Sequence, residues 1–268
     1  MRLKNSVIVV TGASSGIGKA TALAFARKGA RLALGARRLD RLNAVAKMCL
    51  AGGSPDVSVR RLDVGQTADA RAFVAAALRD HDNIDVLVNN AGLGWMGRLH
   101  EMPEEKVDEL VATNLKGVIA TTQAVLPAML ARRRGVIINV SSVVGFRASP
   151  YSAVYSATKH AVVGLSHALR GELSGSGVKV CVVYPGVTNT EFFDSTEVPV
   201  GPMYSAEWVA NLIVRTAQFP RRDAIVMPLR LAHLAEPLFG GLMDHSLGEA
   251  RRLRSPHLSG TGLPPRHG

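Results

Sequence analysis

The chain has 268 residues, of which 47% are hydrophobic and 20% charged, a balance typical of a folded globular protein rather than a disordered or fibrous one. The formal net charge of +11 raises the question of a nucleic-acid partner. The positive charges are scattered apart from Arg132–Arg134 and the basic end, so we expect no nucleic-acid partner.

In chain order, short β-branched runs alternate with longer stretches of helical spacing. The runs predict strands at Val7–Val10, Arg31–Leu34, Val57–Leu62, Val86–Val88, Val136–Val140, Val178–Val183 and Ala224–Met227. The stretches between them predict helices at Gly18–Lys28, Leu39–Leu50, Ala68–Asp80, Glu104–Leu130, Val154–Leu173 and Ala206–Gln218. This alternation is typical of βαβ units, and near-continuous apolar strands indicate helices on both faces of the sheet. We therefore expect an α/β fold with a Rossmann-like, doubly wound, parallel seven-stranded sheet.

No linker or repeat interrupts this rhythm. We expect one domain over residues 1–254 and a flexible basic tail over residues 255–268. Residues 229–249 carry leucines at helical spacing, interrupted by Pro237 and Gly240. This segment is open to several interpretations: packing on its own domain, or covering the substrate mouth, a partner subunit or a lipid surface.

The sequence also predicts the compartment. No apolar run approaches the roughly 18 residues that span a bilayer, and Val7–Val10 is too short for a secretion signal. Cys49 and Cys181 could form one disulfide, but free thiols in a reducing compartment are the better prediction. No Cys and His spacing is typical of zinc. We expect a cytoplasmic protein without a metal and without membrane association.

The first predicted strand runs into a glycine-rich turn that opens a helix. Backbone approaches a pyrophosphate closely only where no Cβ intervenes, and the helix N-terminus presents free N–H groups to the anion. The turn therefore predicts a dinucleotide site, in which two serines add hydroxyl donors, formed by Gly12, Ser14, Ser15, Gly16, Ile17 and Gly18.

The end of the second predicted strand indicates which dinucleotide is bound. In this fold an acid there holds the adenosine ribose of NAD, whereas a cation accommodates the 2′-phosphate of NADP. Here Ala36 is followed by Arg37 and Arg38, whose planar guanidinium groups suit a phosphate. We expect NADP as the cofactor, with these two arginines at its 2′-phosphate.

Further motifs follow in order: Asn89-Asn90-Ala91-Gly92, Asn114, Ser141-Ser142, Tyr155-x-x-x-Lys159 and Pro185-Gly186-x-x-x-Thr190. Together with the glycine turn, this ordered set resembles the compact, single-domain branch of the short-chain dehydrogenase/reductase family over residues 5–228. The resemblance implies additional cofactor contacts from Asp63, Val64, Asn90, Ala91, Gly92, Tyr155, Lys159, Pro185, Gly186, Thr188 and Thr190.

The expected catalytic residues lie on the fifth strand and two helices. Tyr155 and Lys159 lie one helical turn apart, and a cation at that spacing lowers the pKa of a phenol, which is ordinarily about 10. The resemblance implies that Ser142 polarises the substrate carbonyl, with Ser141 as the rival. It also implies that Asn114 holds a water against Lys159.

The expected reaction follows from these roles. NADPH delivers a hydride to a carbonyl carbon, Tyr155 protonates the carbonyl oxygen, and Ser142 stabilises its developing charge. One alternative is a catalytically silent, NADPH-binding regulator, against which the intact Asn–Ser–Tyr–Lys set argues. A basic protein that binds membrane or nucleic acid is the third hypothesis.

Large apolar side chains follow the fourth, fifth and sixth predicted strands, among them Trp95, Met96, Phe146, Phe192 and Phe193. They favour an apolar or aromatic ketone, aldehyde or alcohol as substrate, with residues 192–204 as a lid. In similar proteins the helices at Glu104–Leu130 and Val154–Leu173 pair with their copies, so we expect a homodimer or a homotetramer.

Overall fold

The computed structural model describes residues 1–192, 203–225 and 245–250. Most of the leucine-bearing segment 229–249 and all of the basic tail 255–268 lie outside the described residues. Phe193 and most of the expected lid also lie outside them.

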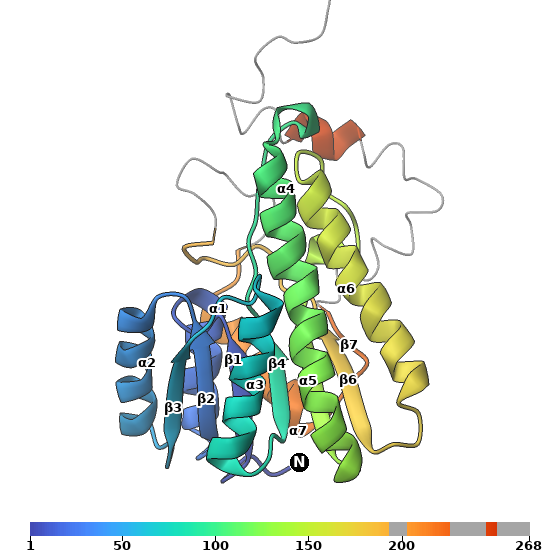
Figure 1. Cartoon of the computed structure of the whole chain (residues 1–268). Helices are drawn as coiled ribbons and strands as arrows, with labels where there is room; N and C mark the ends of the chain where they lie inside the picture. Colours follow the sequence, from blue (N-terminus) through green and yellow to red (C-terminus); the bar gives the residue numbers. More distant parts are fainter. Residues whose placement is uncertain (193–202, 226–244, 251–268) are drawn as a thin grey trace, which may run out of the picture.

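The described residues form a seven-stranded sheet in the order β3-β2-β1-β4-β5-β6-β7, and every pairing is parallel (Figure 1). This confirms the predicted fold class. The strands are β1 Val7–Thr11, β2 Arg31–Ala36, β3 Val57–Arg61, β4 Val86–Asn89, β5 Gly135–Val140, β6 Val178–Val183 and β7 Asp223–Ala224.

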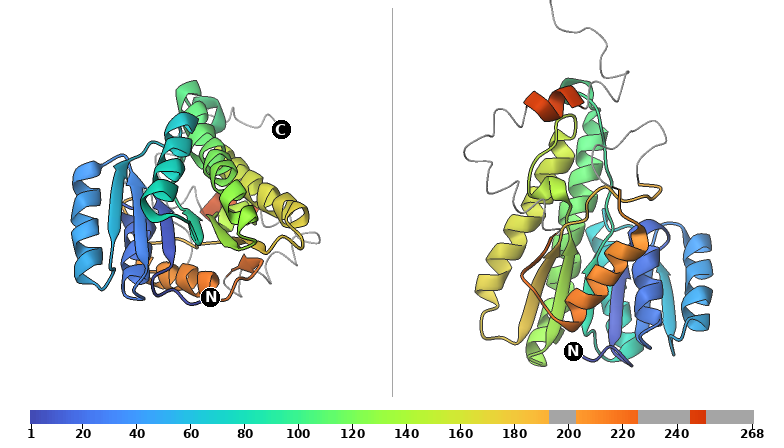
Figure 2. Two further views of the ribbon diagram at one scale, coloured as in Figure 1. Left: turned by 60° about the horizontal axis from the view of Figure 1, so that its bottom comes forward. Right: turned by 180° about the vertical axis from the view of Figure 1, so that it is seen from behind.

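Helices cover both faces of this sheet (Figure 2). The main helices are α1 Gly16–Ala26, α2 Leu39–Ala51, α3 Thr67–His81, α4 Glu104–Val111, α5 Gly117–Ala131, α6 Ala153–Glu172 and α7 Ala206–Gln218. Buried side chains of α1, α2 and α7 share one apolar cluster, and those of α3, α5 and α6 share the other.

The side chains of β1 show how one strand serves both clusters. Ile8 and Val10 belong to the cluster under α1, α2 and α7, whereas Val7 and Val9 belong to the cluster under α3, α5 and α6. Successive strand residues point to opposite faces, so a strand buried on both sides must be apolar at every position. This explains the unbroken apolar run that predicted β1.

The predicted helix Glu104–Leu130 is not continuous. A five-residue π-helical turn, Ala112–Lys116, separates α4 from α5. At its end the Gly117 N–H donates to the carbonyl of Ala112, and a Cβ on Gly117 would stand 2.7 Å from the carbonyl oxygen of Val64. Apolar periodicity persists through the turn, which is why the sequence predicted one helix. Such turns are frequent at functional sites, and this one carries Asn114.

A buried polar network joins β4, β5 and two helices. The Asn89 amide donates to Asn139 at 2.9 Å and accepts from the Thr121 hydroxyl at 2.7 Å. The Asn139 amide in turn donates to the Ser166 hydroxyl of α6 at 2.9 Å. Because each member is satisfied inside the protein, the network fixes α5 and α6 relative to the strands that carry the site.

We expect Asn139→Ala to lower the free energy of unfolding by about 1–3 kcal/mol, because the amide of Asn89 and the hydroxyl of Ser166 would lose their buried partner. Urea unfolding followed by circular dichroism measures this. Gln123→Ala, at an exposed position of α5, is the control and should change stability by less than about 0.5 kcal/mol. Equal effects would mean that the network contributes nothing specific.

Candidate active site

The glycine turn after β1 brings the backbone of two segments into close contact. Gly12 has a φ of +68°, which favours glycine, and a Cβ on Gly18 would stand only 2.1 Å from the Gly12 carbonyl oxygen. The Asn90 amide donates to the carbonyl of Thr11 at 3.0 Å and to that of Gly12 at 3.3 Å. This amide therefore ties the carboxyl end of β1 to the segment that follows β4.

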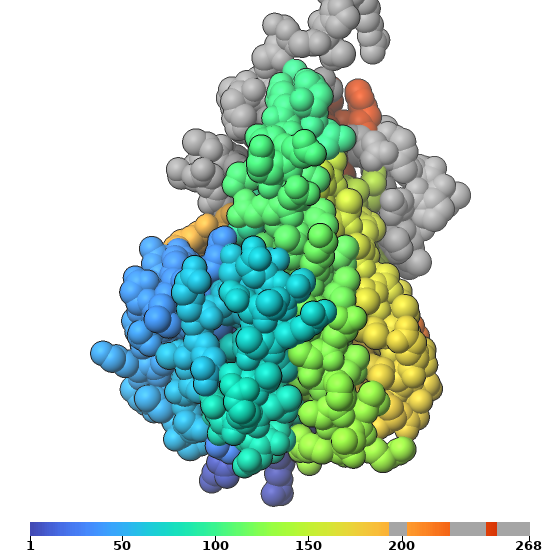
Figure 3. All heavy atoms as spheres, in the orientation of Figure 1, coloured from blue at the N-terminus to red at the C-terminus, as the bar shows by residue number. Residues whose placement is uncertain are grey.

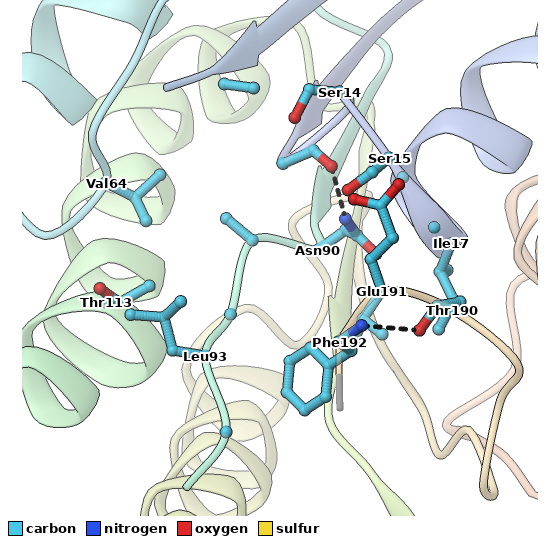
Figure 4. Close-up of a pocket in the computed structure, with 18 of the residues that line it drawn as sticks. Ser14, Ser15, Ile17, Val64, Asn90, Leu93, Thr113, Thr190, Glu191 and Phe192 are labelled. Atoms are coloured by element: carbon cyan, nitrogen blue, oxygen red, sulfur yellow. Dashed lines mark hydrogen bonds between the residues drawn. The ribbon is translucent and has the colours of Figure 1, made fainter. Parts of the chain in front are cut away.

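A cleft of about 430 Å³ opens above this turn, at the carboxyl ends of the strands (Figure 4). Every residue predicted to contact the cofactor lines it. The cleft is also lined by residues that the cofactor prediction did not include: Ala36, Leu62, Leu93, Gly94, Thr113, Val140, Ser141, Ser142, Glu191 and Phe192.

Arginines gather at one end of the cleft. Arg38 donates to the Ser15 hydroxyl at 2.6 Å and to the Glu191 carboxylate at 3.1 Å. Arg41 reaches the same carboxylate oxygen at 2.6 Å, and Arg37 lies 3.7 Å from Glu109. Arg41 was not among the residues predicted from the sequence; it lies in the first turn of α2, three residues after the N-cap residue Arg38.

The two adjacent serines at the end of β5 have different partners. The Ser141 hydroxyl is buried and donates to the carbonyl of Lys159 at 3.0 Å. The Ser142 hydroxyl accepts from the N–H of Val144 at 3.3 Å and lies close enough to the Tyr155 phenol to lower its pKa. The geometry therefore favours Ser142 over Ser141 as the group beside Tyr155.

Lys159 is held by the sheet. Its ammonium Nζ donates to the carbonyl of Val140 at 3.0 Å and lies 5.7 Å from the centre of the Tyr155 ring. Burial disfavours the charged form and lowers the pKa of Lys159 to about 8.

Burial acts on Tyr155 in the opposite direction. It disfavours the phenolate and raises the pKa of Tyr155 to about 12, and the hydrogen bond from Ser142 offsets only part of this rise. From the sequence we expected Lys159 to lower this pKa, and that expectation is wrong for the protein alone, because desolvation by burial is the dominant influence on the phenol. Tyr155 is therefore a protonated phenol at neutral pH.

The Asn114 side chain is engaged by a neighbouring loop. Its amide oxygen accepts from the N–H of Leu93 at 2.8 Å, and its amide nitrogen donates to the carbonyl of Leu93 at 2.9 Å and to the Thr158 hydroxyl at 3.1 Å. Asn114 does not line the cleft. Its role in holding a water against Lys159 stays a prediction.

The segment after β6 closes one side of the cleft. The Thr188 hydroxyl donates to the carbonyl of Gly186 at 2.9 Å, and a Cβ on Gly16 would lie 3.2 Å from Thr190. Both threonines line the cleft, but their hydroxyls bond within their own segment. Direct bonds from them to the cofactor stay a prediction.

The predicted apolar mouth is present in part. Leu93 and Phe192 line the cleft, and the Phe192 ring lies 5.8 Å from that of Tyr155 and against Gly94 (Figure 4). Phe146 packs edge-on against the buried Tyr184 at 5.4 Å, so its expected place at the mouth is not found. Trp95 is also not among the cleft-lining residues.

The family model described as short chain dehydrogenase matches residues 6–199 of this chain. The chain belongs to this family. It is 37% identical over 225 residues to the 3-oxoacyl-(acyl-carrier-protein) reductase FabG of Thermotoga maritima, covering 80% of the chain and 91% of the relative.

Solved structures of this family superimpose on the chain. An alcohol dehydrogenase from Thermococcus sibiricus, complexed with 5-hydroxy-NADP, has a TM-score of 0.75 and 33% identity, covering 82% of this chain and 94% of its own. A short chain dehydrogenase/reductase from Burkholderia phymatum, in complex with NAD, has a TM-score of 0.80 and 26% identity. The match covers 89% of this chain and 96% of that structure's chain.

Other features of the dehydrogenase bear on the remaining expectations. Both cysteines are buried and unpaired, as predicted. Among the described residues, no helix combines the length and apolar character needed to cross a membrane. Within the same residues, no group of three or more His, Cys, Asp or Glu side chains is placed to hold a metal ion.

The pKa of Lys159 gives a test of its burial. Between about 8 and the ordinary value of 10.5, the unfolded chain binds more protons than the folded chain, so folded-state stability rises with pH. We expect the free energy of unfolding of the wild type, relative to Lys159→Met, to rise by up to about 3 kcal/mol between pH 7 and pH 10.5.

Urea unfolding at several pH values measures this difference. Lys47→Met, at an exposed position of α2, is the control for the loss of one positive charge. If the free energy of unfolding of Lys159→Met changed with pH in the same way as that of the wild type, burial of Lys159 would not lower its pKa.

Proposed function

We propose that this dehydrogenase interconverts a carbonyl and a secondary alcohol, with NADP(H) as its cofactor. The observation that carries the proposal is that Tyr155, Ser142 and Lys159 line the same cleft as the glycine turn, with the Lys159 ammonium 5.7 Å from the centre of the Tyr155 ring. Two hydroxyls so placed suit one substrate oxygen, which receives a proton from the first and a hydrogen bond from the second.

The residues at both ends of the cleft fit NADP(H). At the floor, Gly12 and Gly18 lack the Cβ atoms that would collide with neighbouring backbone, so the turn lies tightly at the start of α1, where free N–H groups suit a pyrophosphate. At the ribose end Arg37 and Arg38 line the cleft and Ala36 supplies no acid. The NADP analogue bound by the Thermococcus sibiricus relative adds support. The Burkholderia phymatum relative, by contrast, was solved in complex with NAD.

The bound nicotinamide would supply or accept the hydride. In the reducing direction, Tyr155 carries the proton to the carbonyl oxygen, and its raised pKa keeps that proton in place at neutral pH. Ser142 donates a hydrogen bond to the same oxygen as negative charge develops on it. Lys159 is hydrogen-bonded to the carbonyl of Val140 and lies beside the tyrosine ring. In its protonated form it stabilises the Tyr155 phenolate that remains after proton transfer.

No feature of the described site favours a catalytically silent regulator over an enzyme. A sensor needs the glycine turn and the arginines, but it has no use for a tyrosine and a serine that line the same cleft beside a buried ammonium. We therefore retain the enzyme as the proposal.

An apolar or aromatic substrate fits the lining near Tyr155. Leu93 and Phe192 bring apolar surface there, and Gly94 leaves room for the Phe192 ring. Burial of an apolar group of side-chain size against them contributes about 1.5–3 kcal/mol to binding.

We also propose that the dehydrogenase is a cytoplasmic homodimer or homotetramer. The α5 and α6 helices lie along one face of the molecule (Figure 3). The exposed or half-buried positions on the outer side of α6 are small residues and two histidines, and those of α5 are mostly apolar: Ala157, His160, Ala161, Gly164, His167 and Ala168, and Ile119, Gln123, Pro127 and Leu130. Two copies packed through this face would bury it under two-fold symmetry.

Tyr155→Phe should lower turnover at least ~10²-fold, since it removes the proton donor and keeps the ring. Cofactor affinity should change little. NADPH oxidation across a panel of ketones and aldehydes measures turnover, and fluorescence titration measures affinity. Tyr151→Phe, at a position outside the cleft lining, is the matched control. Near-normal turnover in the Tyr155 variant would overturn the mechanism.

Arg37→Ala and Arg38→Ala should each weaken NADPH binding by about 1.5–3 kcal/mol, the range for hydrogen bonds to charged groups. NADH has no 2′-phosphate, so its binding should hardly change. Calorimetric titration of both cofactors decides the point. Equal weakening of the two would show that the arginines act on the fold and not on the phosphate.

Assembly is tested at Gly164, where an added Cβ would meet nothing within 4 Å in the single chain. Gly164→Glu should therefore leave the fold intact and shift the mass measured by light scattering from an oligomer toward a monomer. Ala51→Glu, at an exposed end of α2, serves as control. A wild type that is monomeric at micromolar concentration would refute the proposed assembly.

A further inference from the structure

One carboxylate spans the cleft at its arginine end. Glu191 follows β6, whereas Arg38 and Arg41 lie at the start of α2, about 150 residues earlier in the chain. A single oxygen of Glu191 accepts from Arg38 at 3.1 Å and from Arg41 at 2.6 Å. Both arginines are thereby turned toward an anion that the chain itself supplies.

This anion lies beside the phosphate-binding turn. Arg38 donates to Ser15 of that turn through one nitrogen and to Glu191 through another. Figure 4 shows Glu191 reaching over to the vicinity of Ser15. Because Arg38 marks the expected position of the 2′-phosphate, the Glu191 carboxylate stands at or next to that position.

An incoming anionic ligand can displace Glu191 from its ion pairs with Arg38 and Arg41. The exposed fractions of the three side chains are 43%, 47% and 62% for Arg38, Arg41 and Glu191. Exposed ion pairs are weak, because water and salt screen them. The pKa of Glu191 is nevertheless held below its ordinary value by Arg41 and Arg38, so the competing group is a carboxylate at neutral pH.

We propose that Glu191 determines cofactor specificity by competing with the 2′-phosphate of NADP(H) for Arg38 and Arg41. This inference rests on the proposed function. A phosphate carries more negative charge than a carboxylate and three acceptor oxygens, so it replaces Glu191 on both guanidinium groups. NAD(H) brings no such group and leaves the ion pairs in place. Glu191 thus selectively weakens the binding of NADP(H). It thereby reduces the difference in affinity between NADP(H) and NAD(H).

Glu191→Gln tests this competition, because it removes the negative charge and keeps the side-chain length. Adenosine 2′,5′-bisphosphate and adenosine 5′-monophosphate are the probes, since they differ only in the 2′-phosphate. At low ionic strength the variant should bind the bisphosphate and NADP⁺ about three- to ten-fold more tightly than the wild type, the range for losing two exposed ion pairs. Binding of the monophosphate and of NAD⁺ should not tighten.

Glu207→Gln is the matched control. Glu207 is an exposed residue near the same end, at the start of α7, and makes no ion pair with the described residues. It should leave the preference for the 2′-phosphate unchanged. If both variants tighten bisphosphate binding equally, or if Glu191→Gln tightens both probes equally, general electrostatics explain the effect and the inference is wrong.

Two outcomes separate this inference from the proposed function. A wild type that binds neither NADP⁺ nor the bisphosphate overturns the proposed cofactor. A wild type that binds both, with affinities that Glu191→Gln does not change, overturns only the competition. Should Glu191→Gln fail to fold by circular dichroism, Glu191→Asp shortens the reach to Arg38 and Arg41, and bisphosphate binding should again tighten.

Discussion

The carbonyl of Gly12 and the Cα of Gly18 approach so closely that no side chain fits between them, and the cleft is built around this contact. It sets the start of α1 directly below the phosphate-binding floor. The Asn90 amide bonds the same turn from β4, so the two strands between which the chain reverses its order are tied at their carboxyl ends.

Burial has opposite effects on the pKa values of Tyr155 and Lys159. The same loss of solvation holds the proton on Tyr155 and weakens the affinity of Lys159 for its own proton. An apolar setting thus favours a neutral phenol beside an amine that can lose its charge. A ligand that brings water or charge into the site will change the pKa values of both Tyr155 and Lys159, because both side chains are buried side by side.

The sequence predicted what local pattern records and missed what depends on distant segments. Apolar runs located the strands, and the ordered motifs located the cleft lining, because both are written in short stretches. The π-helical turn was missed, since apolar spacing continues across Asn114. The pKa of Tyr155 was predicted with the wrong sign, since a single sequence does not tell how deeply a side chain is buried. The pairing of Glu191 with Arg41 leaves no local signal, because Arg41 lies on α2 and Glu191 lies about 150 residues later, after β6.

Glu191 and Phe192 are neighbours in the chain, yet one contacts the arginines at the ribose end of the cleft and the other the ring of Tyr155. One planar peptide unit, with freely rotating bonds on either side, is all that separates the two residues. A substitution at Glu191 therefore acts one residue away from the apolar surface beside Tyr155. Substrate preference should accordingly be measured separately with each nicotinamide cofactor.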